Sequence, residues 1–146
     1  TFIDDKQRLA RDLLEVRFMI EPQMARMAAE HATNDQVVCI KELCDESERL
    51  AETSEDYSAA DTAFHNAIAE SSGNLVVPRL MGVLKTSVPL FIDVTGKKLV
   101  EETIRTHRDV ADAIASRNPT AAHDAMYLHL VYNRNMITEG TQEQSE

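Results

Sequence analysis

The stretch DTAFHNAIAESSGN, residues 61–74, places an aspartate and a histidine four residues apart on a predicted helix. Asp61 and His65 would therefore lie one helical turn apart on one face, where both side chains can reach a single point. Phe64 and Ile68 belong to the same apolar stripe. A carboxylate on a face that is to be buried needs a charged partner or a ligand, so this pair is the first candidate for chemistry.

Two later helices each carry one histidine in the middle of an apolar stripe. The stripe of His107 contains Leu99, Thr103, Val110 and Ile114, and the stripe of His129 contains Ala122, Met126, Asn133 and Met136. Taken singly, a histidine on an apolar face is more often a hydrogen-bonded core residue. Three imidazoles and one carboxylate that point into the same bundle form a set of metal donors instead.

We therefore expect Asp61, His65, His107 and His129 to hold a divalent metal ion. Three nitrogen donors and one oxygen donor suit Zn²⁺ first, and Ni²⁺ or Mn²⁺ also accept them. The other two histidines are not expected to take part. His31 lies at a helix end, where a cation is favoured, and His123 lies in a first helical turn, off the stripe of His129.

Arg17 and Asn133 are candidates for binding a small anion beside that metal. Arg17 lies on the predicted inner edge of the first helix and has Glu21 one turn further on, so an i, i+4 ion pair is one interpretation. The other is a guanidinium fork that grips a carboxylate with two hydrogen bonds. Asn133, one turn beyond His129, can add a hydrogen bond to the same ligand.

Nearly the whole chain has helical periodicity, with four Gly, four Pro and no alternating pattern typical of strands. The first helix is predicted at about Asp5–Ala32, with an apolar stripe from Leu9 to Met27 and a kink or break at Pro22. The second helix is predicted from a cap at Thr33 or Asn34 to about Thr53, and the third opens within residues 54–61 and ends at a left-handed Gly73. One or two short helices then end by Gly96. The last two helices are predicted from Lys97 to about Ser116 and from Pro119, in a first turn, to about Thr138. The expected fold is a single all-α domain over residues 1–146, an antiparallel bundle of six or seven helices.

Composition narrows the partners and the compartment. The chain has 146 residues and a formal net charge of −10, so phosphate backbones repel it and it is a poor nucleic-acid binder by itself. No apolar run approaches the roughly 18 residues that a membrane span needs. Cys39 and Cys44 lie five residues apart on a predicted helix, turned away from each other. We expect free thiols, a reducing compartment and hence a cytoplasmic protein without a membrane partner.

These residues resemble the C-terminal effector-binding domain (FCD) of the FadR-type branch of GntR transcription regulators. The resemblance covers nearly the whole chain and is carried by LLEVRFMIEPQMARMAAEHAT, DTAFHNAIAESSGN and HRDVADAIASRNPTAAHDAMYLHL. Its most specific parts are the E-x-R-x-x-x-E-P run at residues 15–22, the D-x-x-x-H pair, the S-G-N turn and the two later histidines. Many members have Glu directly before the third ligand, where this chain has Thr106.

The resemblance implies that Asp61, His65, His107 and His129 hold a divalent ion and that Arg17 contributes to a site for a small carboxylate effector. It also implies an N-terminal winged helix-turn-helix that nothing in these residues encodes. The chain is therefore expected to be the sensory half, which reaches DNA only through that missing domain. We expect a homodimer, with LVVPRLMGVL at residues 75–84 as its most apolar candidate surface; burial of the same segment in the core is the equal alternative.

Three functions compete at this point. The first is a ligand-sensing and dimerisation module of a transcription regulator, which is not an enzyme. The second is a metal-dependent hydrolase that activates water at the same three histidines and aspartate, but the sequence contains no H-E-x-x-H and no spare carboxylate on the stripes of His107 and His129. The third is a purely structural bundle whose histidines are satisfied core residues.

Overall fold

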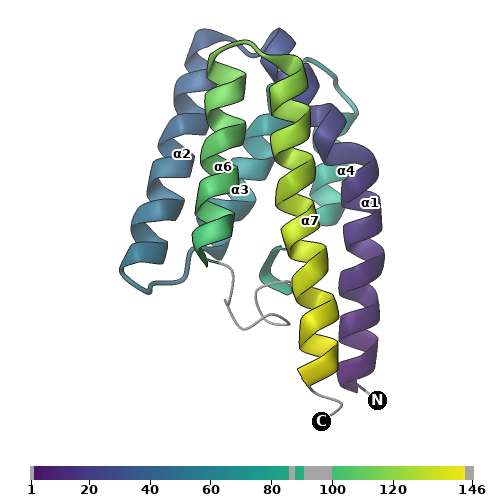
Figure 1. Ribbon diagram of the computed structural model, residues 1–146. Helices are drawn as coiled ribbons and strands as arrows, with labels where there is room; N and C mark the ends of the chain where they lie inside the picture. The colour runs from purple at the N-terminus through teal and green to yellow at the C-terminus, as the bar shows by residue number, and fades with distance from the viewer. Residues whose placement is uncertain (1, 86–87, 91–99, 144–146) are drawn as a thin grey trace.

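The computed structural model describes residues 2–85, 88–90 and 100–143, and most of them are helical. With the labels of Figure 1, the helices are α1 (Phe2–His31), α2 (Asn34–Glu52), α3 (Ser58–Glu70), α4 (Val77–Leu84), α6 (Val100–Ala115) and α7 (Pro119–Glu143). No strand occurs within these ranges. The predicted all-α bundle is confirmed.

The two longest helices, α1 and α7, lie side by side, with the start of α1 and the end of α7 at the same end of the bundle (Figure 1). Helix α6 packs against α7, and α2 packs against both α6 and α3. Helix α1 also contacts α3 and α6. Residues that face inward from α1, α3, α6 and α7 can therefore meet in one interior.

The buried face of α1 differs from the predicted stripe. Leu9 is 52% exposed and Val16 38% exposed, whereas Ala10 and Leu14, outside the predicted stripe, are buried; Met24 of that stripe is buried as predicted. The inner face also includes the small residues Ala25, Ala28 and Ala29, and two charged residues, Arg17 and Glu21. Small side chains let neighbouring helices approach α1 closely, and the polar pair breaks the apolar periodicity on which the prediction relied.

Pro22 does not interrupt α1, so the predicted break is wrong. A proline inside a helix removes one backbone hydrogen bond and costs about 3 kcal/mol. The helix continues because the residues around Pro22 are fixed by tertiary packing, with Glu21, Met24 and Ala25 each at most 1% exposed. Packing of this kind contributes more to helix stability in proteins than local propensity does.

The other helix boundaries follow local signals. Thr33 caps α2 in a capping box with Gln36, and Pro119 opens α7. Gly73 has the expected left-handed backbone, with φ of 75°, although α3 itself ends at Glu70. Residues 91–99, which include the predicted end at Gly96 and start at Lys97, lie outside the described residues.

Helix α7 is longer than predicted. It continues through Thr138 to Glu143, whereas the sequence indicated an end near Thr138. Ile137 forms a buried cluster with Ala10 and Leu14 of α1 and with Leu130. This contact with α1 supports the C-terminal part of α7.

Helix α4 buries Met81 and Leu84 and leaves a second apolar face outside. Cys39 is exposed and Cys44 buried, and both are free thiols as predicted. None of the described helices is both long and apolar enough to cross a membrane.

Candidate metal centre

Helix α3 presents Asp61 and His65 to the interior, as the spacing predicted. Asp61 lies in the first turn of the helix, where the positive end of the helix dipole favours a carboxylate. The two side chains are 6% and 2% exposed. The dipole alone therefore does not account for Asp61, because its carboxylate lies inside the bundle rather than in water.

His107 of α6 and His129 of α7 reach the same place, and each is 2% exposed. One ligand atom from each of His65, His107 and His129 lies within 4.8 Å of the others. The Oδ1 atom of Asp61 lies 3.2 Å from Nε2 of His65 and 3.2 Å from Nε2 of His107. The structure thus brings together all four residues that the sequence singled out.

Three of the ligand atoms that meet here have no hydrogen-bond partner. Among the described residues, the buried side-chain atoms that lack one are Oδ1 of Asp61, Nε2 of His65 and Nε2 of His107. The 3.2 Å contacts between them are short enough to attract but do not have hydrogen-bond geometry. A buried unsatisfied polar group costs about 1–3 kcal/mol, and a divalent cation that displaced any proton from these atoms would satisfy all three. The donor set fits such an ion.

Glu21 is a site residue that sequence reasoning treated only as a partner for Arg17. Its side chain is fully buried, with one carboxylate oxygen on Nε of Arg17 and the other on Nδ1 of His65. The predicted i, i+4 pair with Arg17 is present. Because a carboxylate only accepts hydrogen bonds, Nδ1 of His65 carries the proton and Nε2 is left to face Asp61.

Arg17 and Asn133 are buried, 3% and 4% exposed respectively. Burial is the main cause that lowers the pKa of His107 and of His129, and the positive charge of the nearby Arg17 lowers both further. Asn133 lies one turn beyond His129 on α7. Both residues are therefore buried on the helices α1 and α7 that border the four candidate ligands, and their role in binding a small molecule stays a prediction.

The buried charges interact strongly. Burial raises the pKa of the Asp61 carboxyl, but the surrounding imidazoles of His107, His65 and His129 outweigh it and hold that pKa below its ordinary value. Burial lowers the pKa of His65, yet Glu21 and Asp61 together raise it to about 9. For His107 burial prevails, and its pKa falls to about 4. In the metal-free protein at neutral pH, His65 is therefore protonated on both ring nitrogens and His107 is neutral, so a metal ion would have to displace the proton on Nε2 of His65.

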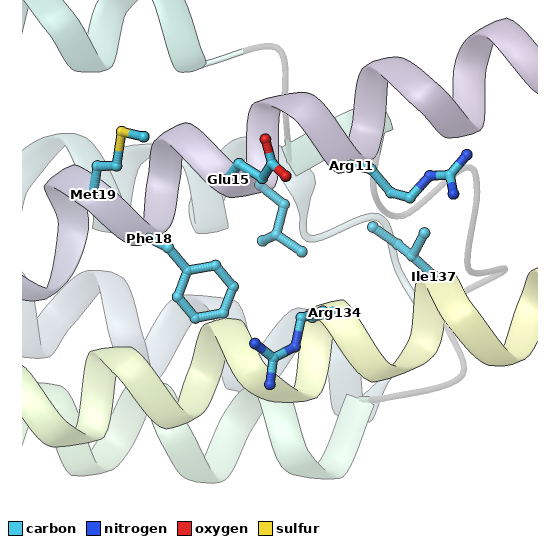
Figure 2. A pocket seen from close by; sticks show the side chains of 7 residues that line it. Arg11, Glu15, Phe18, Met19, Arg134 and Ile137 are labelled. Carbon is cyan, nitrogen blue, oxygen red and sulfur yellow. The ribbon is translucent and has the colours of Figure 1, made fainter.

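A separate groove of about 620 Å³ lies on the outer side of α1 and α7 (Figure 2). It is lined by Arg11, Leu14, Glu15, Phe18, Met19, Arg134 and Ile137, none of which belongs to the cluster described above. Phe18 and Arg134 follow Arg17 and Asn133 directly in the sequence. The groove and the buried cluster thus use adjoining faces of the same two helices.

Comparison with known proteins identifies the class of domain. The family model of the FCD domain matches residues 12–132, and the chain belongs to that family. A solved structure of a GntR protein from Streptococcus agalactiae superposes with a TM-score of 0.78 at 32% identity, over 90% of this chain and 60% of that one. The resemblance inferred from the sequence is confirmed.

Curated relatives agree with this assignment. The HTH-type transcriptional regulator YcbG of Bacillus subtilis is 29% identical over 90% of this chain and 55% of its own length. The Uxu operon regulator of Haemophilus influenzae is 30% identical over 82% of this chain and 47% of its own length. The galactonate operon transcriptional repressor of Escherichia coli is 26% identical over 94% of this chain and 62% of its own length. The chain spans about half the length of the curated relatives it matches. These relatives are transcriptional regulators, which supports the prediction that the chain is not an enzyme and disfavours the metal-dependent hydrolase.

The raised pKa of His65 predicts how the stability of the metal-free protein depends on pH. The folded protein holds the extra proton of His65 up to about pH 9, whereas an unperturbed histidine loses it near 6.5. The resulting stabilisation is complete below about pH 6.5 and is lost as the pH rises to about 9. Urea denaturation of chelator-treated protein should show a free energy of unfolding that falls over this range, and His65→Gln should flatten the fall. A wild-type value that stays constant or rises would contradict the charge assignment.

Proposed function

We propose that this chain is the effector-binding and dimerisation domain of a metabolite-responsive transcription regulator, with a divalent metal ion held by Asp61, His65, His107 and His129. The observation that carries the proposal is the set of three buried, unsatisfied ligand atoms that converge between α3 and α6. The family assignment and the names of the relatives support the regulatory role. DNA binding would belong to a part of the regulator outside this chain, and the compartment would be the cytoplasm.

The charge of the centre favours an anionic effector. Asp61 and Glu21 supply two negative charges, while Arg17 and a bound divalent ion would supply three positive ones, with His65 neutral once it is a ligand. The loaded centre would therefore carry one net positive charge inside an apolar bundle. A monocarboxylate would neutralise it, whereas a neutral sugar would not.

The named residues give that carboxylate a place. Glu21 contacts Nε of Arg17, so the two Nη groups are the atoms that we assign to the effector. The ion would supply Lewis-acid binding of a carboxylate oxygen, and Asn133 a hydrogen bond to a polar substituent. We infer a small hydroxy acid as the preferred class, ahead of a dicarboxylate. One relative is named for a galactonate operon, and galactonate is a hydroxylated monocarboxylate.

The purified domain should contain about one divalent ion per chain, because the four donors form a single site. Zn²⁺ is the first expectation, with Ni²⁺ and Mn²⁺ as alternatives. His107→Ala and His129→Ala should lose most of the metal in elemental analysis by mass spectrometry. His123→Ala is the matched control, since His123 lies on α7 as well but pairs with Asp124 at the surface. Equal metal content in the wild type and all three variants would refute the proposed metal site.

Effector binding is best tested with Arg17→Lys rather than Arg17→Ala. Removing the charge would break a buried ion pair and leave the buried Glu21 with His65 as its partner, a change that typically costs about 3–5 kcal/mol of stability. Lysine keeps the charge and loses the two-pronged contact. Calorimetry against a panel of organic acids should show binding to Arg17→Lys weakened about ten- to a hundredfold, which corresponds to roughly 1.5–3 kcal/mol.

Two controls make the calorimetry decisive. Arg11→Lys changes an exposed arginine of the same helix and should bind like wild type. Metal-stripped protein should bind the acid far more weakly than loaded protein. If a carboxylate binds the stripped protein just as tightly, the ion is structural and does not take part in sensing.

The structure also offers a surface for the proposed homodimer. Leu75, Val76, Leu80 and Val83 form the outer apolar side of the α4 segment, with exposed fractions of 90%, 59%, 43% and 73%. Each copy carries a formal charge of −10, so charge opposes association and an apolar face must drive it. We assign this face to contact with a second copy of the chain.

Light scattering should find wild type as a dimer at micromolar concentration and Val83→Glu as a monomer, because the new carboxylate would be buried at the contact. Val38→Glu, at an exposed valine of α2, is the matched control and should remain dimeric. A monomeric wild type would refute the dimer. A dimeric Val83→Glu would place the contact on another face.

A further inference from the structure

Thr106 makes three contacts that together define the orientation of a neighbouring imidazole. Its side chain is buried on α6, directly before His107. Its Oγ1 atom lies 2.7 Å from the carbonyl oxygen of Glu102 and 3.2 Å from that of Thr103. On its other side, Oγ1 lies 2.9 Å from Nδ1 of His129 on α7.

The single hydroxyl proton decides the direction of these hydrogen bonds. A carbonyl oxygen only accepts, so the hydroxyl donates to Glu102, which is the shorter of its two carbonyl contacts. The oxygen then has lone pairs to offer to His129. The contact with Nδ1 is therefore an N–H···O bond in which His129 donates, and Nε2 of His129 carries no proton in the neutral ring.

The unprotonated nitrogen is the one available to a metal. The ring of His129 lies with its centroid 4.5 Å from that of His107 and 5.4 Å from that of His65. Glu21 orients His65 from α1 in a parallel way, through a bond to its Nδ1. In both cases a group on one helix sets the tautomer of a histidine on another helix.

We propose that Thr106 is a positioning residue that holds His129 with Nδ1 protonated and Nε2 turned to the metal. The effect of Thr106 on metal binding rests on the proposed metal site, whereas the tautomer of His129 follows from the hydrogen bonds of Thr106 alone. The chain thus supplies from α6 both a ligand, His107, and the group that orients the next ligand. A hydroxyl performs here, without a charge, the role that a carboxylate performs for His65.

The test compares Thr106→Val with Thr106→Ser. Valine has nearly the shape of threonine and lacks the hydroxyl, whereas serine keeps the hydroxyl and lacks the methyl group. Loss of a group that orients a metal ligand typically weakens metal binding about 10- to 100-fold. Competition of the domain with a chromophoric chelator for Zn²⁺ should show this loss for Thr106→Val and near wild-type affinity for Thr106→Ser. Melting of the metal-free forms checks that both variants fold.

A second readout does not depend on the metal. Nitrogen-15 NMR of the metal-free wild type at neutral pH should show His129 protonated at Nδ1, and Thr106→Val should lose this preference. Thr106→Val with wild-type Zn²⁺ affinity, or a wild-type His129 protonated at Nε2, would overturn the proposal. If wild type binds no Zn²⁺ while His129 carries its proton on Nδ1, the positioning role stands and the proposed metal site fails.

Discussion

The convergence of a carboxylate and imidazoles on one buried point is the constraint to which the rest of the bundle is adjusted. Asp61 approaches His65 and His107 without a hydrogen bond to either, far from water. Such an arrangement is costly unless something compensates for it. The helices that meet there nevertheless pack closely around it, since Phe64, Val110 and Met126 beside the site are fully buried. The cluster of unsatisfied ligand atoms in a well-packed interior is the basis on which we propose a metal site here.

Helix α1 supplies charged groups that interact with the buried cluster, and small residues that let the other helices pack closely against it. Arg17 and Glu21 occupy the inner face where an ordinary amphipathic helix would have apolar residues, and Ala25, Ala28 and Ala29 follow on the same face. Glu21 links the guanidinium to His65 of α3. A carboxylate bound at Arg17 would therefore act on Glu21, the same group that orients His65, a proposed metal ligand. This contact between α1 and α3 offers a physical route by which an effector could change the packing of the longest helices, which allosteric control of an attached DNA-binding part would require.

The sequence was sufficient for the fold class and for the side chains that meet, because His107 and His129 each lie in register with buried neighbours such as Val110 and Met126. Periodicity failed on α1, where alanines and a charged pair form the inner face and larger apolar residues such as Leu9 face outward. The roles of Glu21 and Thr106 depend on contacts over 44 and 23 residues of sequence. No local pattern contains such contacts. The one available signal in the sequence was the spacing of Glu21, four residues after Arg17 and three before Met24, which places it on the helix face of an apolar residue.

If an ion occupies the point between these side chains, a crystal of the domain as purified should contain it there. Diffraction data collected on both sides of the absorption edge of the co-purified metal would locate the ion by its anomalous signal. We expect one strong peak per chain, about 2.0–2.2 Å from Nε2 of His65, His107 and His129 and from an oxygen of Asp61. A map without a peak between these four residues, or with the ion bound elsewhere, would contradict the proposed metal site.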